Sequence, residues 1–332
     1  MSHVAVLGAG AWGTALSRQL AERGQRVRLW SFRPEHAQAL REQRENVEFF
    51  PGHKLHEAVE PEHELGRAVA DASAVLVVVP TPAVRATLLA ARESLAAGTL
   101  IVLASKGIET SSAMLLSEVV GDVLGADFER RSVALSGPSF AEEVARGLPT
   151  NLVAASRESA SATAAQALLS SERLRVYTSS DPVGVQVGGA LKNVMAIAAG
   201  ASDGLGFGHN TRAGLITRGL AEMARLAAAK GGEAGTLSGL SGLGDLVLTA
   251  TGALSRNRTL GFELARGRTL AEAQQALGHV AEGVTTAKSA HELGARLGVE
   301  LPISSTVYRV LYEDKPVYDA VRELLHRMPG KE

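Results

Sequence analysis

The chain has 332 residues, 45% of them hydrophobic and 21% charged, which predicts two globular domains rather than one. Its 34 lysines and arginines nearly balance 35 acidic residues, and the resulting net charge of −1 excludes an extended basic surface for nucleic acid. The absence of cysteine excludes disulfides, thiolate metal sites and a cysteine nucleophile, and it fits a reducing cytoplasm.

The N-terminal half alternates apolar runs with helical patterns. We expect strands at 4–7, 26–30, 74–79, 100–104, 133–135, 152–155 and 174–177. We expect helices at 14–23, 34–43, 84–96, 113–124, 140–145 and 160–169. Continuous runs of Val, Leu and Ile are typical of parallel strands that are buried on both faces. The alternation therefore predicts an α/β domain with a doubly wound, Rossmann-type sheet.

The strand pattern stops after Tyr177. Asp181-Pro182 has the form of a helix N-cap followed by proline in the first turn, and beyond it we find only helical patterns and glycine-rich loops. We therefore predict a Rossmann domain over 1–178 and an all-α domain over 179–332. The first three residues lead directly into an apolar run, so we expect no signal peptide. We also expect no membrane span, because no run approaches about 18 apolar residues.

The first glycine-rich loop fits the pattern G-x-G-x-x-G, with its glycines at Gly8, Gly10 and Gly13. The pattern alone is weak, but here it follows a predicted strand and opens a predicted helix, as dinucleotide binding requires. In that context the glycines permit a tight turn, close approach of the pyrophosphate and packing of the helix on the strand. Trp12 either packs against the coenzyme or covers the core.

The end of the second predicted strand bears on coenzyme choice. An NAD-selective site usually places an acidic residue there for the ribose 2′-hydroxyl, whereas this chain has Arg33 near that position. We favour a contact between Arg33 and a 2′-phosphate, with a solvated arginine before Pro34 as the alternative. This predicts that NADPH is used at least as well as NADH.

Polar residues also follow two later strands, where ligands of open α/β sheets bind. Lys106 is either a surface lysine or a cation for a phosphate or carbonyl oxygen. Gly137 and Ser139 offer a backbone and a hydroxyl donor to a small ligand. The simpler alternative is a turn in which Ser139 caps the next helix.

Lys192 is the only charged residue within 183–200, a stretch otherwise rich in alanine, valine and glycine. A buried ammonium is costly unless it is paired or used, and desolvation would lower its pKa toward a range useful for proton transfer. Gly188 and Gly189 leave room for another segment to approach one turn earlier. The alternative is a lysine whose amine extends to solvent.

Asp245 is a candidate partner for Lys192, although it also suits a helix N-cap. Thr249 follows four residues later and shares its helix face. The cluster that follows, Ser255, Arg256 and Asn257 with Arg258, has the donors of a phosphate site, because arginine binds phosphate through a planar pair of donors. A charged helix start is the alternative.

Seven motifs give the chain a resemblance to the bacterial NAD(P)-dependent glycerol-3-phosphate dehydrogenases, from about Val4 to Tyr312. They are GAGAWGTAL (8–16), VVVPT (77–81), SKG (105–107), LSGPSFAEEVARGLPT (135–150), GVQVGGALKNVMAIAAG (184–200), GLGDLVLT (242–249) and SRNR (255–258). The resemblance implies reversible reduction of dihydroxyacetone phosphate to sn-glycerol 3-phosphate for phospholipid synthesis. It also implies NADP or NAD as coenzyme, a cytoplasmic homodimer, and no metal.

The resemblance also implies roles for individual residues. Lys192 would be the proton donor and acceptor. The substrate would be held by Lys106, Gly137, Ser139, Lys192, Asp245, Ser255, Arg256 and Asn257. The dinucleotide would contact Ala11, Trp12, Arg33, Lys106, Ala141, Arg256, Val280 and Glu282. The family often has serine at the position of Ala11, so one hydroxyl contact is missing here.

Two other functions remain open on the residues. A β-hydroxyacid dehydrogenase would share the architecture and the helix lysine, but its asparagine would follow the lysine by four residues, whereas Asn193 follows Lys192 directly. A non-catalytic NAD(P)-sensing module would keep the glycine-rich loop without needing Lys192 or Asp245. A nucleotide-sugar dehydrogenase is excluded because it needs a cysteine.

Overall fold

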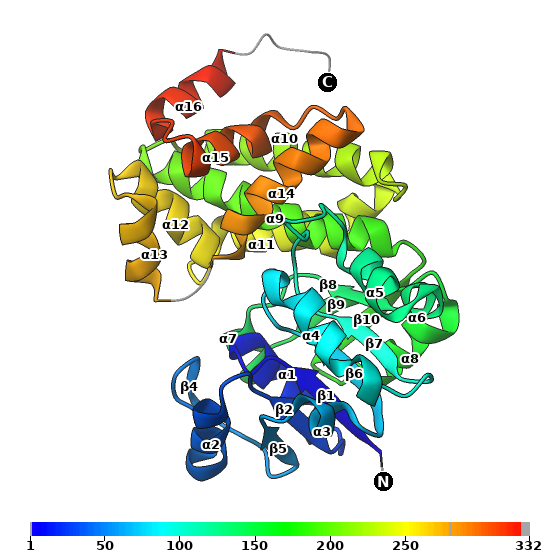
Figure 1. Cartoon of the computed structure of the whole chain (residues 1–332). Helices are drawn as coiled ribbons and strands as arrows, with labels where there is room; N and C mark the ends of the chain where they lie inside the picture. Colours follow the sequence, from blue (N-terminus) through cyan, green and yellow to red (C-terminus); the bar gives the residue numbers. More distant parts are fainter. Residues whose placement is uncertain (1, 279–280, 327–332) are drawn as a thin grey trace. The chain divides into compact units, whose positions relative to one another are not determined.

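The computed structural model describes residues 2–278 and 281–326, and it divides into two compact units (Figure 1). Unit 1 comprises Met1–Lys106 and Leu116–Pro182, and unit 2 comprises Gly107–Leu115 and Val183–Glu332. The segment Gly107–Leu115 thus belongs to unit 2, although the predicted division placed it in the N-terminal domain. Its side chains explain the difference, because Ile108, Ala113 and Leu115 lie in the hydrophobic core of unit 2.

Unit 1 is built on an eight-stranded sheet with the order β10-β9-β8-β7-β6-β1-β2-β5. Its strands are β1 (His3–Leu7), β2 (Val27–Trp30), β5 (Val59–Glu62), β6 (Ala72–Val77), β7 (Leu100–Leu103), β8 (Val133–Ser136), β9 (Thr150–Ala155) and β10 (Leu174–Ser179). All pairs are parallel except β8 with β9. The strand order reverses at β1, which lies between β2 and β6, so the predicted Rossmann-type sheet is confirmed.

The sheet is a buried layer because its central strands are apolar along their whole length. Val4, Val6, Leu29 and Leu76 have no exposed surface and share one core with the first helix. The helices of unit 1 are α1 (Ala11–Glu22), α2 (Pro34–Gln43), α3 (Leu65–Val69), α4 (Val84–Ala91), α5 (Leu116–Leu124), α6 (Ala126–Arg131), α7 (Ala141–Ala145) and α8 (Ser159–Leu169), with short 3₁₀ turns η1 (Thr81–Ala83) and η2 (Arg92–Ser94).

The seven predicted strands are all present, with ends shifted by one or two residues. Three strands were not predicted: β5 and the two-stranded hairpin of β3 (Glu45–Asn46) and β4 (Phe50–Lys54). Strand β5 contains Pro61 and lies at the edge of the sheet, where a residue without an N–H is tolerated. The helix predicted from 113 begins at Leu116, because Ala113 has a left-handed backbone conformation (φ 56°).

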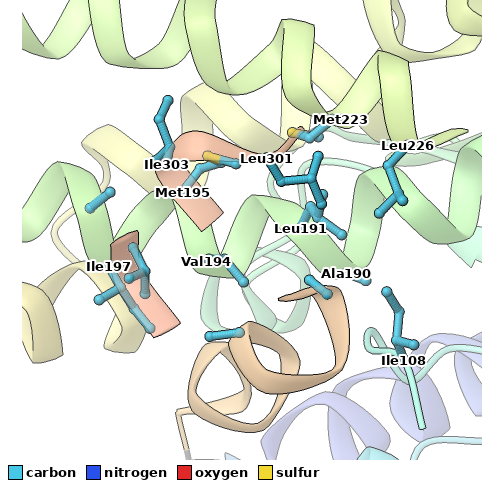
Figure 2. Packing of buried hydrophobic residues seen from close by; sticks show 14 of the residues in the cluster. Ile108, Ala190, Leu191, Val194, Met195, Ile197, Met223, Leu226, Leu301 and Ile303 are labelled. Atoms are coloured by element: carbon cyan, nitrogen blue, oxygen red, sulfur yellow. The ribbon is translucent and has the colours of Figure 1, made fainter. Parts of the chain in front are cut away.

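Unit 2 is helical, as predicted. Its helices are α9 (Pro182–Gly204), α10 (His209–Ala229), α11 (Asp245–Thr251), α12 (Arg256–Ala265), α13 (Leu270–Leu277), α14 (Glu282–Leu297), α15 (Pro302–Tyr312) and α16 (Val317–Leu325), with a 3₁₀ turn η3 (Ala234–Ser238) and a π-helical turn η4 (Leu240–Gly244). Figure 2 shows side chains of α9, among them Leu191 and Met195, packed with Met223, Leu226 and Leu301.

Helix α9 corrects one expectation. By length and composition it is apolar enough to cross a membrane, with a mean hydropathy of 1.2, although no such run was expected. The structure supplies the reason for its composition, since 94% of the apolar window is buried. A helix that is apolar on all sides is typical of the centre of a helical domain.

Candidate functional site

The three glycines of the first loop meet different constraints. Gly8 has a positive φ of 123°, and a Cβ there would lie 2.9 Å from the backbone of Val78 and Val79. A Cβ on Gly13 would lie 1.9 Å from the carbonyl oxygen of Gly8. Both glycines are therefore required by the fold. A Cβ on Gly10, by contrast, would meet no atom within 4 Å.

Gly10 is also the N-cap residue of α1, where its φ of −81° is accessible to any residue. Neither backbone strain nor packing explains glycine at this position. A bulky group that approaches the loop from outside would explain it, and the N-terminus of a helix attracts negative charge. These features fit the pyrophosphate of a dinucleotide.

Three of the predicted coenzyme residues lie in one small apolar cluster. Ala11 and Trp12 of α1 and Ala141 of α7 pack against a buried group comprising Ala15, Phe50, Val144 and Ala145. Trp12 also packs against the main core of the sheet, and it is half-buried. It thus covers the core, as one of the two interpretations proposed.

Arg33 is the N-cap residue of α2 and is 42% exposed. Its guanidinium forms ion pairs with Glu48 and, at 3.8 Å, with Glu35. It also lies 5.6 Å above the ring of Phe49. Neither Glu48 nor Phe49 lies within a recognised motif, so neither was predicted from the sequence. An acidic side chain therefore contacts Arg33, although none follows β2 directly.

Lys106, Gly137 and Ser139 are brought together within unit 1. The Lys106 Nζ donates to the Gly137 carbonyl at 3.1 Å, and the Ser139 hydroxyl donates to the same oxygen at 3.0 Å. Gly137 has a φ of 130°, and a Cβ there would lie 2.9 Å from the Asn151 carbonyl. Phe140, not Ser139, is the N-cap residue of α7, so the alternative that assigned Ser139 to that cap is wrong.

Lys192 and Asp245 form a buried ion pair within unit 2. The Lys192 Nζ lies 2.6 Å from Asp245 Oδ1 and donates to the Thr249 hydroxyl at 3.0 Å. Asp245 has no exposed surface and the Lys192 side chain is 10% exposed. The Thr249 hydroxyl in turn donates to the Asp245 carbonyl at 2.6 Å. The alternative of a solvated lysine does not hold.

The backbone explains how α9 and α11 come so close. A Cβ on Gly188 would lie 2.5 Å from the carbonyl oxygen of Ser241 in the π-helical turn η4. The absent side chain therefore lets η4 contact α9 one turn before Lys192, as the glycine pattern predicted. Asp245 follows η4 directly as the first residue of α11, and Gly244 rather than Asp245 is the N-cap residue.

Ser255, Asn257 and Arg258 are engaged in structural contacts at the start of α12. The Ser255 Oγ caps the helix by accepting from the Arg258 N–H at 3.2 Å. Asn257 donates to the Asn193 amide oxygen at 2.9 Å and accepts from the Gly283 N–H at 2.9 Å. The Arg258 guanidinium pairs with Asp203 at 2.7 Å.

Arg256 differs from its neighbours. It is exposed, and the described residues offer it no hydrogen bond or ion pair. Its guanidinium is therefore available to a ligand, at a helix N-terminus that also favours negative charge. Of the two arginines in the motif, Arg258 is held by Asp203, whereas Arg256 forms no hydrogen bond or ion pair with the described residues.

The remaining predicted residues are placed as follows. Glu282 is half-buried at the first position of α14, and its carbonyl accepts from the hydroxyls of Thr285 and Thr286. Val280 lies outside the described residues. Across the described ranges, no group of three or more His, Asp or Glu side chains is arranged to hold a metal ion.

Comparison with known proteins covers nearly the whole chain. Two family models match it: NAD-dependent glycerol-3-phosphate dehydrogenase N-terminus over residues 3–162 and C-terminus over residues 181–322. A glycerol-3-phosphate dehydrogenase (NAD(P)+) of Geobacter sp. (strain M21) is 49% identical over 98% of this chain and 97% of its own. One from Chlorobium phaeobacteroides (strain BS1) is 46% identical, over 99% and 98%.

Comparison with solved structures indicates the same family. The crystal structure of glycerol-3-phosphate dehydrogenase from Coxiella burnetii has a TM-score of 0.94 at 41% identity, covering 98% of this chain and 99% of its own. The enzyme from Saccharomyces cerevisiae has a TM-score of 0.81 at 25% identity, covering 97% and 98%. A ketopantoate reductase from Ralstonia eutropha shares only the fold, at 19% identity and a TM-score of 0.58. The chain therefore belongs to the NAD-dependent glycerol-3-phosphate dehydrogenase family.

Proposed function

We propose that this protein catalyses the reversible NAD(P)-dependent reduction of dihydroxyacetone phosphate to sn-glycerol 3-phosphate, a precursor of glycerophospholipids. The observation that carries the proposal is the buried contact between Lys192 and Asp245, with Nζ and Oδ1 2.6 Å apart. A buried ion pair is weak evidence for stability, because the desolvation of both charges offsets their attraction. Its presence within this family fits a role in chemistry.

The glycine-rich loop and the N-terminus of α1 would hold the pyrophosphate of the coenzyme. Ala11, Trp12, Ala141, Glu282 and Val280 would supply further contacts, and Arg33 would contact the adenosine ribose or its 2′-phosphate. When bound, NAD(P)H supplies the hydride for the ketone carbon.

Lys192 would act on the oxygen of the same carbonyl group. Its ammonium donates a proton to that oxygen and stabilises the negative charge that develops there. Asp245 and the Thr249 hydroxyl fix the position of Nζ before the substrate arrives, so little reorganisation is needed. In the oxidation direction, the neutral amine would accept the proton of the C2 hydroxyl.

The substrate phosphate would bind at the start of α12. Arg256 supplies two parallel donors, and the first N–H groups of a helix lack intrahelical acceptors. Ser255 and Asn257 would complete this site, although both already make structural contacts. In unit 1, the Lys106 ammonium and the Gly137–Ser139 turn would contact the other polar groups of the substrate.

Two alternatives are less well supported. A β-hydroxyacid dehydrogenase would act on a carboxylate rather than a phosphate, and family membership favours the phosphorylated substrate. A sensing module has no use for a buried Lys192–Asp245 pair. We further propose a homodimer, a cytoplasmic location, which the cysteine-free composition fits, and a domain boundary near residue 178.

Loss of NAD(P)H absorbance in the presence of dihydroxyacetone phosphate tests this function. We expect turnover with the phosphorylated ketone and very little with dihydroxyacetone, because the remote phosphate supplies binding energy that orients the carbonyl. Equal rates with the two ketones would contradict the assignment of the substrate. No turnover with either coenzyme would contradict the function itself.

A further inference from the structure

Asn46 lies in strand β3, in a segment that no coenzyme motif covers, and it has no exposed surface. Its amide nitrogen donates to the Ala9 carbonyl at 2.9 Å and to the Thr14 hydroxyl at 2.8 Å. Its oxygen Oδ1 is bonded to His36 Nε2 at 3.1 Å and accepts from the Phe49 N–H at 3.2 Å. All four bonds that an amide side chain can form are therefore made.

These contacts connect Asn46 to the glycine-rich loop and to the helix that follows it. Ala9 lies between Gly8 and Gly10, and Thr14 lies in the first turn of α1. In a trans peptide the C=O and the following N–H point in opposite directions. Because the Ala9 carbonyl is held against Asn46, the Gly10 N–H is directed to the opposite side of the peptide.

The same amide reaches the second strand through His36. Oδ1 can only accept, so His36 Nε2 is the donor in that contact, and His36 Nδ1 is hydrogen-bonded to the Ser31 hydroxyl at 2.9 Å. His36 and Ser31 are themselves buried. Ser31 follows β2 and precedes Arg33 by two residues. One buried chain of hydrogen bonds thus joins the glycine-rich loop to the segment that follows β2.

We propose that Asn46 is a positioning residue for the coenzyme: it fixes the Ala9–Gly10 peptide and, through His36, couples the glycine-rich loop to the end of β2. The proposal rests on the proposed function, since it assigns the loop to NAD(P). Asn46 makes no contact with the coenzyme itself in this role. Its effect is on the geometry that the pyrophosphate meets, and a site that is loosely held loses affinity.

The test compares Asn46→Leu with Gln166→Met. Gln166 also belongs to unit 1, and its amide nitrogen donates to the Val176 carbonyl at 2.7 Å, between α8 and β10. Each variant removes a buried or half-buried amide contact and replaces the amide with an apolar side chain of similar length. NADH binding is measured by the fluorescence of the bound coenzyme, and turnover is measured at saturating NADH.

We expect Asn46→Leu to raise the Kd for NADH about tenfold or more, because buried polar groups of the loop lose their partners. Turnover at saturating NADH should stay within about twofold of wild type. Gln166→Met should leave the Kd within about twofold. Equal changes of Kd in the two variants would overturn the proposal, since any loss of an amide contact in unit 1 would then have the same effect.

If Asn46→Leu does not fold, Asn46→Asp and Gln166→Glu give the same comparison. Asn46→Asp keeps the acceptor for Phe49 but loses the donors to Ala9 and Thr14. The added charge also repels the pyrophosphate, so binding is measured at about 1 M salt, where the Debye length falls to about 3 Å. The binding assay needs no substrate. A wild-type chain that binds NADH without reducing the ketone contradicts only the proposed function, whereas one that binds no coenzyme contradicts both.

Discussion

The effects of a Lys192 substitution on turnover and on stability can be measured separately. In Lys192→Met the proton donor and its charge are lost, so turnover should fall by about 10³-fold or more. The same change leaves Asp245 buried without its cation, which should cost about 3–5 kcal/mol of stability. Steady-state kinetics and urea unfolding measure the two effects separately.

The double variant Lys192→Met with Asp245→Asn is the control. It removes both charges, so much of the lost stability should return, whereas turnover should stay low. A Lys192→Met protein that keeps more than about a tenth of wild-type turnover would rule out proton transfer by this residue. The sequence-based expectation of a lowered Lys192 pKa stays a prediction.

Arg256 should determine recognition of the substrate phosphate. Arg256→Lys keeps the charge but loses the pair of parallel donors, so the KM for dihydroxyacetone phosphate should rise about tenfold or more. The control is Arg266→Lys, at the exposed far end of the same helix, which should leave this KM unchanged. Comparable increases in both variants would mean that α12 responds to any loss of an arginine, and would remove Arg256 from the site.

Arg33 and Glu48 should set the preference between coenzymes. We expect wild type to use NADPH at least as well as NADH, even though a 2′-phosphate must compete with Glu48 for the guanidinium. Glu48→Gln removes that competition. An exposed ion pair contributes about 0.2–1 kcal/mol, so the affinity for NADPH relative to NADH should increase by up to about fivefold.

The ratio of the two dissociation constants, measured by titration, checks this. Glu35→Gln is the matched control, because Glu35 lies farther from Arg33, at 3.8 Å. A wild-type preference for NADH above about tenfold would contradict the assignment of Arg33 to the 2′-phosphate. An unchanged ratio in Glu48→Gln would mean that Glu48 does not compete for it.

At the scale of elements, local patterns predicted the parts that bury continuous apolar surface. The strand Ala72–Val77 was predictable because it ends in a continuous apolar run, and the start of α2 was predictable because proline follows Arg33. Strand β5 was not, since Val59-Glu60-Pro61-Glu62 has too few apolar residues and its pairing with β2 depends on the edge of a sheet. The path of Gly107–Leu115 into unit 2 depends on contacts far away in sequence, such as Ser289 with the Ile108 carbonyl.

Some residues of the candidate site could likewise be predicted from the sequence, and others could not. Lys192 and Asp245 could be paired from the sequence because a charge in an apolar helix needs a partner, and few acids lie in comparable surroundings. Asn46 could not be identified, because its contacts with Ala9 span 37 residues and no pattern marks them. Arg256 and Arg258 cannot be distinguished from the sequence. Only the ion pair between Arg258 and Asp203 shows that Arg258 has a structural role.

Helices α9 and α12 pack backbone against backbone, which should couple the Lys192 helix to the Arg256 helix. A Cβ on Gly200 would lie 1.8 Å from the Arg258 carbonyl, and one on Gly261 would lie 1.9 Å from the Ile197 carbonyl. Gly200→Ala should therefore push α12 away, cost about 1–3 kcal/mol and raise the KM for dihydroxyacetone phosphate.

Gly214→Ala provides the contrast. Gly214 is exposed within α10, where a Cβ meets nothing within 4 Å, so alanine should stabilise the protein by about 0.5–1 kcal/mol. Urea unfolding measures the stability of both variants, and substrate saturation curves measure their KM for dihydroxyacetone phosphate. If Gly200→Ala lowers stability but leaves the KM unchanged, the crossing of α9 and α12 is structural only.

For the molecule as a whole, each unit holds its own candidate residues on its own hydrophobic core. Unit 1 presents the coenzyme loop with Lys106, Gly137 and Ser139, and unit 2 presents Lys192, Asp245 and Arg256. Lys106 follows β7 and Gly137 follows β8, whereas Asp245 and Arg256 begin helices and Lys192 lies in the middle of α9.

Glu222 makes the stability of unit 2 dependent on pH. Its buried carboxyl, on α10, accepts hydrogen bonds from the Ile303 and Ser304 N–H groups at the start of α15. Burial raises the pKa of Glu222 above its ordinary value of 4.5, against the lowering effect of those bonds. Between the unfolded and the folded pKa, the folded state holds a proton that the unfolded state has released. The free energy of unfolding therefore falls as the pH rises through this window.

The side chain of Glu222→Gln stays neutral at every pH, so its free energy of unfolding should not decrease through this window. At pH values below about 4.5 the variant should be less stable than wild type by about 1 kcal/mol, because the amide offers one oxygen instead of two to the N–H groups. As the pH rises to about 8, the wild-type protein should lose stability relative to the variant, and the difference should shrink or change sign. Urea unfolding of both proteins across this range measures the difference directly. Glu313→Gln, an exposed carboxyl in the same unit, is the matched control. An equal pH trend in the two variants would show that the titration of Glu222 does not contribute.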